Sequence, residues 1–361
     1  MIIKELKLES FRSYKFLEIP INSGVNLFYG DNGSGKSSII ESIYFSLTGK
    51  SFRTNDTNIL IQNNKSLTQT LLVFDNGKSI KITKKHNKRA KITHNRNEKT
   101  ENFTNLVKKF PNCLVENKEF FFTTSNPEQK RNYLNKTLFY VEHMDSFLLN
   151  ELKKVVSQRS ACLKKNDLNQ IKYWDEKLIE VEPKILLLNE KICKKINDYL
   201  EMSEIVSIFS EKNPWINNLR IKYEPGYDVL CSFSDVLNRN YEKDCILKRT
   251  TEGPHKRSFK IELENSEVSE ILSRGQQKII SIILHLIQRE IIIEHTDLTP
   301  ILLMDDISSE LDKENANLML KYLVDNSVQT IMTSIDISHY SNHKDVFLFH
   351  VEHSGEFSNV K

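Results

Sequence analysis

The stretch from Leu27 to Leu47 constrains the fold of this 361-residue chain more than any other. It reads L-F-Y-G-D-N-G-S-G-K-S-S-I-I-E-S-I-Y-F-S-L. Val25–Tyr29 is a short apolar run typical of a buried strand, and the apolar residues after Ser37 recur at helical spacing along one face. The sequence therefore predicts a strand, a glycine-rich loop and a helix in that order.

The loop has the spacing G-x-x-x-x-G-K-S, which is typical of a phosphate loop. Glycines let backbone N–H groups turn toward a triphosphate such as ATP, and the helix N-terminus adds a partial positive charge. Lys36 is expected to reach the outer phosphates, and the Ser37 hydroxyl to ligate Mg²⁺. A glycine-rich turn that happens to contain a lysine is the alternative, but the flanking strand and helix favour the phosphate loop. The expected nucleotide-binding residues of the loop are Gly30, Asn32, Gly33, Ser34, Gly35, Lys36, Ser37 and Ser38.

Length and composition narrow the class of protein. The chain is long enough for one large α/β domain with an inserted subdomain. Lys and Arg number 51 against 48 Asp and Glu, so the net charge of +3 indicates no particular partner. The five cysteines lack C-x-x-C spacing, which is typical of free thiols in a reducing compartment, and we expect a cytosolic protein. No run is long and apolar enough for a bilayer, so no membrane segment is expected.

Two strands are expected before the phosphate loop. Met1–Ile21 alternates apolar and polar residues around a polar bend at Phe11–Tyr14. Arg12 sits at that bend, where its side chain could reach a nucleotide bound one strand away. An exposed arginine in a surface turn is an equally good interpretation.

The most basic part of the chain follows the first helix. Leu71–Phe74, Lys78–Thr83 and Ala90–His94 are predicted as short strands of a meander. Their positive charges could follow a DNA backbone, although a solvated hairpin face is the commoner reason for such a run. The basic residues are Lys78, Lys81, Lys84, Lys85, Lys88, Arg89, Lys91, Arg96 and Lys99.

From about Pro127 the apolar spacing becomes helical and stays so to Tyr199, which predicts a helical arm inserted into the α/β domain. Tyr227–Ser232 is expected to be extended, and Ser258–Leu263 to be a strand. The expected domains are residues 1–124 with the phosphate loop, residues 125–225 as the helical arm, and residues 226–361 as the return to the α/β domain.

Two further segments complete the expected site. Leu272–Lys278 reads L-S-R-G-Q-Q-K and places a serine and a glycine at a helix N-terminus, a geometry that suits an anion. Pro300–Asp306 is a buried apolar strand that ends in two carboxylates, Asp305 and Asp306, which are suitable oxygen ligands for Mg²⁺ or an attacking water. A solvated strand end is the alternative. Ser308–Asp312, S-S-E-L-D, follows it.

These motifs resemble the ATP-binding-cassette ATPases of the RecF/SMC type. G-D-N-G-S-G-K-S corresponds to Walker A, L-S-R-G-Q to the signature, I-L-L-M-D-D to Walker B and S-S-E-L-D to the D-loop. Within that group the chain resembles the RecF family through F-R-S-Y, G-K-S-F-R-T, N-P-E-Q-K-R-N-Y-L-N, Q-R-S-A-C-L-K and G-P-H. The resemblance implies an α/β cassette ATPase head, with a mixed sheet, an antiparallel β lobe and an inserted short helical arm.

The resemblance also implies roles for residues. ATP would lie between two protomers in a head-to-tail dimer, with Lys36 on the β- and γ-phosphates and with Ser37 and Asp305 on Mg²⁺. Asp306 would position the attacking water, where most cassette enzymes use glutamate, so slow hydrolysis is expected. The residues implied to act in trans, from the signature and D-loop, are Ser273, Arg274, Gly275, Gln276 and Asp312.

The implied function is an ATP-dependent DNA-binding protein of recombinational repair and replication. An ATP-induced homodimer would clamp duplex DNA, gaps or single-strand/double-strand junctions, and slow DNA-dependent ATP hydrolysis would release it. Recombination-mediator proteins are the implied partners. The alternative is a RecF-like sensor or motor of a defence system with a separate nuclease. The ATP-binding subunit of a transporter is disfavoured by the helical arm and by S-S-E-L-D.

The chain departs from the cassette pattern at three places. The switch histidine of transporter cassettes is absent, with Thr333 and Ser334 at the equivalent strand end, so any sensing of the γ-phosphate there would use a hydroxyl. No Q-loop glutamine is evident near Val115–Glu119. After G-P-H the chain carries Lys256–Ser258, where RecF-like chains usually have basic and acidic residues.

Overall fold

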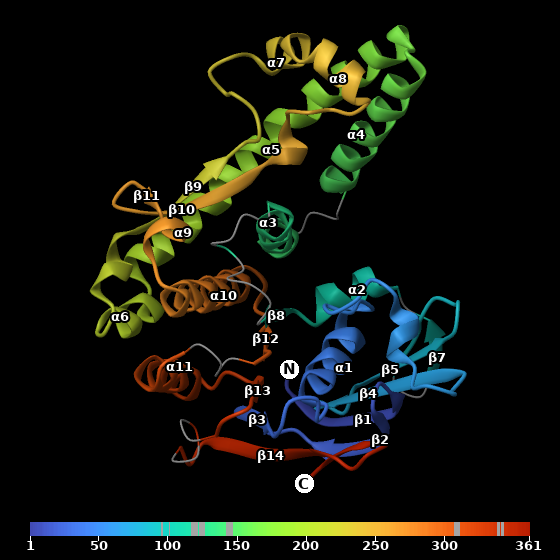
Figure 1. The fold of residues 1–361 in the computed structure, drawn as a ribbon, viewed down its shortest axis with the longest axis vertical. Coiled ribbons are helices and arrows are strands. Elements are labelled where there is room, and N and C mark those ends of the chain that lie inside the picture. The colour runs from blue at the N-terminus through green and yellow to red at the C-terminus, as the bar shows by residue number, and fades with distance from the viewer. Residues whose placement is uncertain are drawn as a thin grey trace. The chain divides into compact units, whose positions relative to one another are not determined.

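The computed structural model divides the chain into two units. The first combines Met1–Glu119 with Arg274–Lys361, and the second is Phe120–Ser273. Figure 1 shows the chain coloured from its N-terminus to its C-terminus. The structure describes residues 1–94, 97–100, 102–116, 122, 127–141, 147–306, 311–337, 340 and 343–361.

The first unit contains two six-stranded sheets. One is an antiparallel sheet in the order β2-β1-β4-β5-β6-β7, and the other is ordered β15-β14-β3-β13-β12-β8, with only β15 antiparallel to its neighbour. This arrangement confirms the predicted mixed sheet and antiparallel lobe. The elements are β1 (Ile3–Phe11), β2 (Tyr14–Pro20), β3 (Val25–Tyr29), α1 (Lys36–Thr48), η1 (Thr57–Leu60), β4 (Leu67–Phe74), β5 (Ser79–Lys85), β6 (Lys91–His94), β7 (Asn97–Thr100), α2 (Phe103–Lys109), β8 (Asn112–Val115), α10 (Arg274–Thr296), β12 (Ile301–Met304), α11 (Lys313–Asp325), β13 (Thr330–Ser334), β14 (Val346–His353) and β15 (Ser358–Val360).

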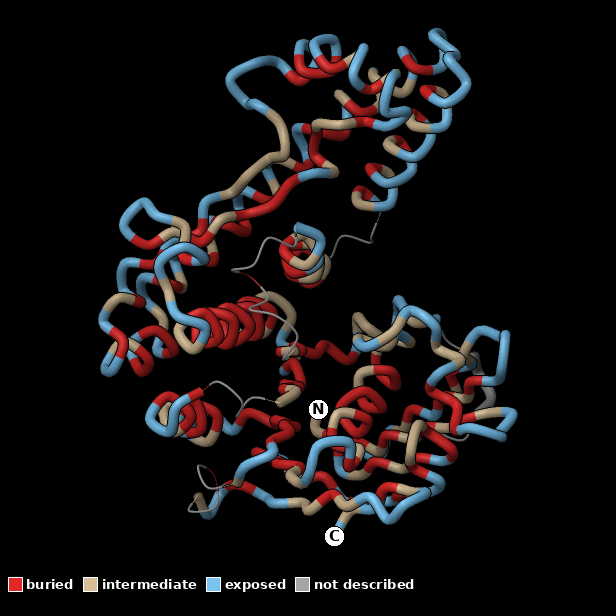
Figure 2. Tube along the Cα trace, viewed as in Figure 1, coloured by how far each residue is buried: buried red, intermediate tan, exposed pale blue. Residues whose placement is uncertain are grey.

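Helix α1 joins the two sheets through one continuous core. Its buried Ile39 and Ile43 share an apolar cluster with Leu72 of the antiparallel sheet and with Leu303 and Ile331 of the mixed sheet. Figure 2 shows these inner segments as buried and the outer turns as exposed. Burial of so many branched side chains is the main stabilising contribution expected for this unit, and it fixes the helix that begins at the phosphate loop.

The parallel strands bring the predicted site residues to one edge of the sheet. In the pairing register, Tyr29 of β3 lies opposite Ser334 of β13, and Met332 of β13 lies opposite Met304 of β12. The carboxyl ends of all three strands therefore meet, and ligands of open α/β sheets bind in the crevice at that edge. The phosphate loop follows β3, and Asp305 follows β12.

The second unit is built on two long helices with a small sheet. The apolar faces of α4 and α5 pack with α7, through residues that include Leu152, Leu178 and Val236. An antiparallel sheet in the order β11-β10-β9 belongs to the same unit. The elements are α3 (Pro127–Val141), α4 (Phe147–Lys165), α5 (Leu168–Met202), α6 (Glu204–Ser210), η2 (Pro214–Asn218), β9 (Leu219–Glu224), α7 (Phe233–Arg239), α8 (Tyr241–Leu247), η3 (Pro254–Lys256), β10 (Ser258–Leu263), β11 (Ser266–Glu267) and α9 (Val268–Ile271).

The second domain boundary differs from the prediction. The arm was expected to end at residue 225, but the second unit continues to Ser273. The reason is strand pairing, because β10 pairs antiparallel with β9 along its whole length, from Ser258 opposite Glu224 to Leu263 opposite Leu219. The predicted extended segment Tyr227–Ser232 forms no strand, and the strand lies just before it, in β9. No helix among the described residues has the length and apolar character needed to cross a membrane.

Candidate functional site

The phosphate loop is held by close packing at both ends and is open in the middle. Gly30 and Gly35 have φ values of +148° and +111°, which L side chains rarely adopt. A Cβ at Gly30 would lie 2.2 Å from the Val351 carbonyl oxygen, and a Cβ at Gly35 would lie 2.6 Å from Ser358 Oγ. By contrast, a Cβ at Gly33 would meet nothing within 4 Å. The loop therefore rests on the β14–β15 hairpin and leaves its centre accessible.

Lys36, the first residue of α1, folds its side chain back over the loop. Its Nζ donates hydrogen bonds of 2.7 Å to the carbonyl oxygens of Gly30 and Asp31. Burial lowers the pKa of Lys36, and the nearby carboxylates of Asp306, Asp305 and Asp31 act in the opposite direction. A buried cation at the N-terminus of a helix is a suitable environment for an anion.

Both Walker B aspartates are tied to the next strand through one hydroxyl, Asp305 by its carboxylate and Asp306 by its backbone. Thr333 Oγ1, at the end of β13, donates to Asp305 Oδ1 at 2.9 Å. The same oxygen accepts a hydrogen bond of 2.8 Å from the Asp306 backbone N–H. Asp306 has a φ of +48°, an uncommon conformation for a residue other than glycine. The buried Thr333 thus fixes how the two carboxylates leave the strand.

One cavity of about 180 Å³ brings the predicted residues together. From the phosphate loop it includes Asn32, Gly33, Gly35, Lys36, Ser37 and Ser38, and from the strand ends it includes Asp306 and Thr333. Asp305 and Gly30 are not among its lining residues, nor is Ser34, whose side chain is buried. Three lining residues were not predicted as part of the site. They are Ser13, Arg53 and Ile335.

A larger cavity of about 780 Å³ adjoins the first and shares Ser13, Ser38 and Arg53 with it. Arg12 lines this larger cavity and not the smaller one. Its guanidinium also donates two hydrogen bonds, of 2.9 and 2.7 Å, to the fully buried carboxylate of Glu41. The prediction placed Arg12 near a nucleotide, and the structure adds a structural partner that the sequence did not reveal.

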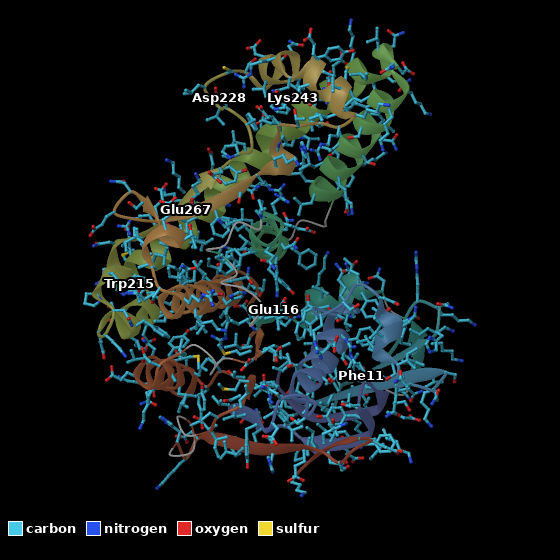
Figure 3. All side chains as sticks on the ribbon, viewed as in Figure 1. Phe11, Glu116, Trp215, Asp228, Lys243 and Glu267 are labelled. Atoms are coloured by element: carbon cyan, nitrogen blue, oxygen red, sulfur yellow. The ribbon has the colours of Figure 1, made fainter. Side chains whose placement is uncertain are left out.

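The bend that carries these residues is anchored in the core. Phe11, labelled in Figure 3, is fully buried at the end of β1 and packs on Phe45 of α1 with ring centroids 6.3 Å apart. Arg12 itself has a φ of +53°. The sequence signal for Ser13 was its place beside Arg12 in F-R-S-Y, and the signal for Arg53 was its place in the polar turn after the first helix.

The residues expected to act in trans lie outside both cavities. Ser273 and Arg274 are exposed where α10 begins, and Gly275 and Gln276 are half-buried in its first turn. Asp312 is exposed, and its carboxylate accepts the Asn315 backbone N–H at the start of α11. Residues 308–310 of the expected D-loop and residues 117–119, where a Q-loop was sought, lie outside the described residues.

The basic meander is exposed with one exception. Lys84 is buried, and its Nζ donates to Asn58 Oδ1 and to the carbonyl oxygens of Lys85 and Lys88 at 2.7 to 2.9 Å. It therefore ties a turn together and is unavailable to DNA. The side chains of Arg96 and Lys99 lie outside the described residues. The exposed members of the run are Lys78, Lys81, Lys85, Lys88, Arg89 and Lys91.

The residues of the smaller cavity fit ATP with Mg²⁺. The open centre of the loop at Gly33, the buried Lys36 and the helix N-terminus suit phosphate groups. Ser37 and Asp306 line the same cavity, and Asp305 precedes Asp306 at the end of β12. Hydroxyl and carboxylate oxygens such as those of Ser37 and Asp305 are what Mg²⁺ prefers. The adjoining cavity has a volume within the range of small-molecule sites.

Sequence comparison gives a match over almost the whole chain. The matching family is described as the RecF/RecN/SMC N terminal domain, and the match covers residues 2–357. A curated DNA replication and repair protein RecF from Pseudoalteromonas translucida is 29% identical, over 98% of each chain. The RecF of Shewanella halifaxensis is 27% identical over 93% of this chain and 91% of its own. The resemblance to the RecF family inferred from the motifs is confirmed.

Comparison of folds agrees with this result. A solved structure of the recombination mediator protein RecF with ATPrS in the RecFOR pathway has a TM-score of 0.82 and covers 99% of this chain and 97% of its own. The two sequences are 24% identical, so this likeness concerns the fold. The predicted α/β cassette head is therefore confirmed.

Proposed function

The chain belongs to the RecF/RecN/SMC family, and from that premise we propose that it is an ATP-binding protein of DNA replication and repair that uses ATP to control its hold on DNA. The observation that carries the proposal is that Lys36 and Asp306 line the same cavity. These residues come from segments 270 positions apart and supply the phosphate-binding and water-positioning groups of an ATPase site.

In this proposal the chain's own residues divide the work. The loop N–H groups and Lys36 bind the phosphates, and the Lys36 ammonium neutralises charge that develops during phosphoryl transfer. Ser37 and Asp305 hold Mg²⁺, which neutralises charge on the phosphates when it is bound. Asp306 orients the attacking water. An aspartate is shorter than glutamate, so we expect slow hydrolysis that works as a timed switch.

The second half of the site comes from another copy of the chain. Ser273 and Gly275 are accessible at the start of α10 and line neither cavity of their own protomer. We propose that they contact the γ-phosphate held by a partner in a head-to-tail homodimer, together with Arg274, Gln276 and Asp312. Binding of ATP would then close the dimer around DNA, and hydrolysis would release it.

DNA is the proposed macromolecular partner. The exposed lysines of the basic meander offer phosphate contacts, and affinity from such contacts falls as salt rises. Solved and curated relatives are named as RecF, one of them as a recombination mediator of the RecFOR pathway. By extension we propose action in the cytosol at gapped or junction DNA, with mediator proteins that help to load a recombinase.

Sedimentation in the presence of a short labelled duplex tests the proposal. Wild type, Lys36→Met and Asp306→Asn are each compared with and without Mg-ATP. We expect wild type and Asp306→Asn to dimerise and retain DNA only with ATP, and Lys36→Met to do neither. Assembly and DNA binding that ignore ATP in all three proteins would contradict the mechanism.

A further inference from the structure

Ser13 lies at the boundary between the two cavities of the candidate site. It lies in the bend between β1 and β2, and it lines both the smaller cavity and the larger one that adjoins it. A group that borders both spaces stands where the phosphate chain of a nucleotide would continue into its nucleoside. The chain therefore places a hydroxyl at that junction.

The orientation of this hydroxyl is set from the other end of the chain. Ser358, in β15, is almost fully buried, and its Oγ donates a hydrogen bond of 2.7 Å to Ser13 Oγ. The Ser358 backbone N–H also donates to the Ser13 carbonyl oxygen at 3.1 Å. Two contacts, one through the backbone and one through the side chains, thus hold Ser13 to the hairpin.

The next group in the chain of hydrogen bonds is His353. Its Nδ1 lies 3.2 Å from Ser358 Oγ. Because the Ser358 proton goes to Ser13, the histidine contact is satisfied when Nδ1–H donates and Ser358 Oγ accepts. Ser13 Oγ then accepts from Ser358 and keeps its own hydrogen to donate. No described residue is recorded as the acceptor of that hydrogen, and the side chain lines the cavity.

The same hairpin also supports the phosphate loop. Ser358 Oγ is the atom nearest to a Cβ placed at Gly35, and the Tyr14 hydroxyl donates to the Gly35 carbonyl oxygen at 3.2 Å. Gly35 is the residue just before α1. The bend, the end of the loop and β15 therefore form one packed arrangement around the Ser13 hydroxyl.

We infer that Ser13 is a nucleotide-binding residue that donates a hydrogen bond to the α-phosphate or ribose, and that Ser358 is the positioning residue that orients it. This inference rests on the proposed ATP site. It implies that the β14–β15 hairpin, which carries Ser358, contributes to the affinity for nucleotide. Because the contact is at the inner end of the phosphate chain, it serves ATP and ADP alike.

The test measures dissociation constants for Mg-ATP and Mg-ADP on the full chain, for Ser13→Ala, Ser358→Ala and the double variant. Loss of one hydrogen bond is expected to weaken binding of both nucleotides about fivefold in each single variant. The double variant is expected to bind no more weakly than Ser13→Ala, because Ser358 acts through Ser13. Asn359→Ala, the exposed neighbour on β15, is the matched control and keeps wild-type affinity.

Three results would overturn the inference. They are wild-type affinity in both single variants, additive losses in the double variant, or a loss confined to ATP, which would place Ser13 at the γ-phosphate. Failure of the proposed function looks different, because then wild type itself binds no Mg-ATP and Lys36→Met changes nothing. Thermal unfolding of each variant shows whether a loss of affinity comes from a loss of fold.

Discussion

Thr333 Oγ1 donates a hydrogen bond of 2.9 Å to Asp305 Oδ1 and so joins the end of β13 to the end of β12. The same oxygen accepts the Asp306 backbone N–H, so one side chain orients the Asp305 carboxylate and the backbone of Asp306. In cassette transporters a histidine stands at the equivalent strand end. In this chain the hydroxyl of a β-branched residue, stiff at χ1, performs the positioning.

Thr333→Val is therefore expected to slow ATP hydrolysis by about tenfold or more, in line with the loss of groups that orient metal-site carboxylates. Because the loop N–H groups and Lys36, and not Thr333, are proposed to bind the phosphates, the affinity for Mg-ATP should change little. Steady-state hydrolysis and equilibrium nucleotide binding measure the two effects separately.

Thr333→Ser is the matched control for that prediction, since it keeps the hydroxyl and removes only a methyl group. We expect it to retain most of the hydrolysis rate. Equal rates in the valine and serine variants would show that packing, and not the hydrogen bonds, matters at this position.

Arg12→Met is expected to lower the free energy of unfolding by about 3 kcal/mol. The substitution removes the guanidinium that donates two hydrogen bonds to the buried Glu41 carboxylate. Urea unfolding of the protein without nucleotide measures the change. Arg53→Met is the matched comparison. Arg53 lies 3.6 Å from the same carboxylate and its side chain is 39% exposed, so its loss should cost under about 1 kcal/mol.

Similar costs for the two arginine variants would contradict this interpretation of Arg12. In that case the pairing with Glu41 contributes no more than a surface contact, and the main role of Arg12 is at the cavity that it lines.

Arg159→Met is expected to destabilise the second unit by about 3 to 5 kcal/mol. The fully buried Arg159 donates to Asp175, to Asp244 at 2.5 Å and to Thr250 at 3.0 Å, and Asp244 is almost fully buried. Without the guanidinium, a buried carboxylate has lost its cation. Hydrogen exchange of amides in α4, α5 and α8 follows the local stability.

Lys177→Met is the comparison for the arm, because Lys177 pairs with Glu180 at an exposed site on α5. Its loss should leave stability almost unchanged, because the pair is exposed to solvent. If amide hydrogen exchange in α4, α5 and α8 were as slow in Arg159→Met as in Lys177→Met, the buried network around Arg159 would have no structural role.

His255 is expected to make the second unit sensitive to acid. Its Nε2–H donates to the Thr250 carbonyl oxygen at 3.1 Å, and burial lowers the pKa of the imidazole from 6.5 to about 4. The unfolded chain then binds the proton first, so stability is full above pH 6.5 and is lost as pH falls toward 4, by up to about 3 kcal/mol.

His255→Gln removes this titration, so the stability of the variant relative to wild type should rise as pH falls from 6.5 to 4. Urea unfolding at several pH values measures the difference. Asn359→Ala, at an exposed position that carries no titratable group, is the control and should run parallel to wild type. Parallel profiles for His255→Gln as well would show that His255 is protonated equally in the folded and unfolded chains.

Local pattern was sufficient for the elements whose residues determine their own conformation. The predicted strands Val25–Tyr29 and Ser258–Leu263 are β3 and β10 with the same bounds, and α1 begins at Lys36. Glycines, apolar periodicity and charge at the helix start act over a few residues, so the sequence alone is enough to predict the elements that they form.

Contacts between segments that are distant in the sequence could not be predicted from such local patterns. Nothing in the sequence indicates that Ser13 meets Ser358, or that Arg12 meets a buried Glu41. Those pairs arise because the bend between β1 and β2 packs against β15 of the other sheet and against helix α1. The extension of the second unit to Ser273 likewise follows from the pairing of β9 with β10. The sequence by itself determined the phosphate loop, its strand and its helix, whereas only the tertiary structure decided which side chains support them, because packing joins residues without regard to their distance along the chain.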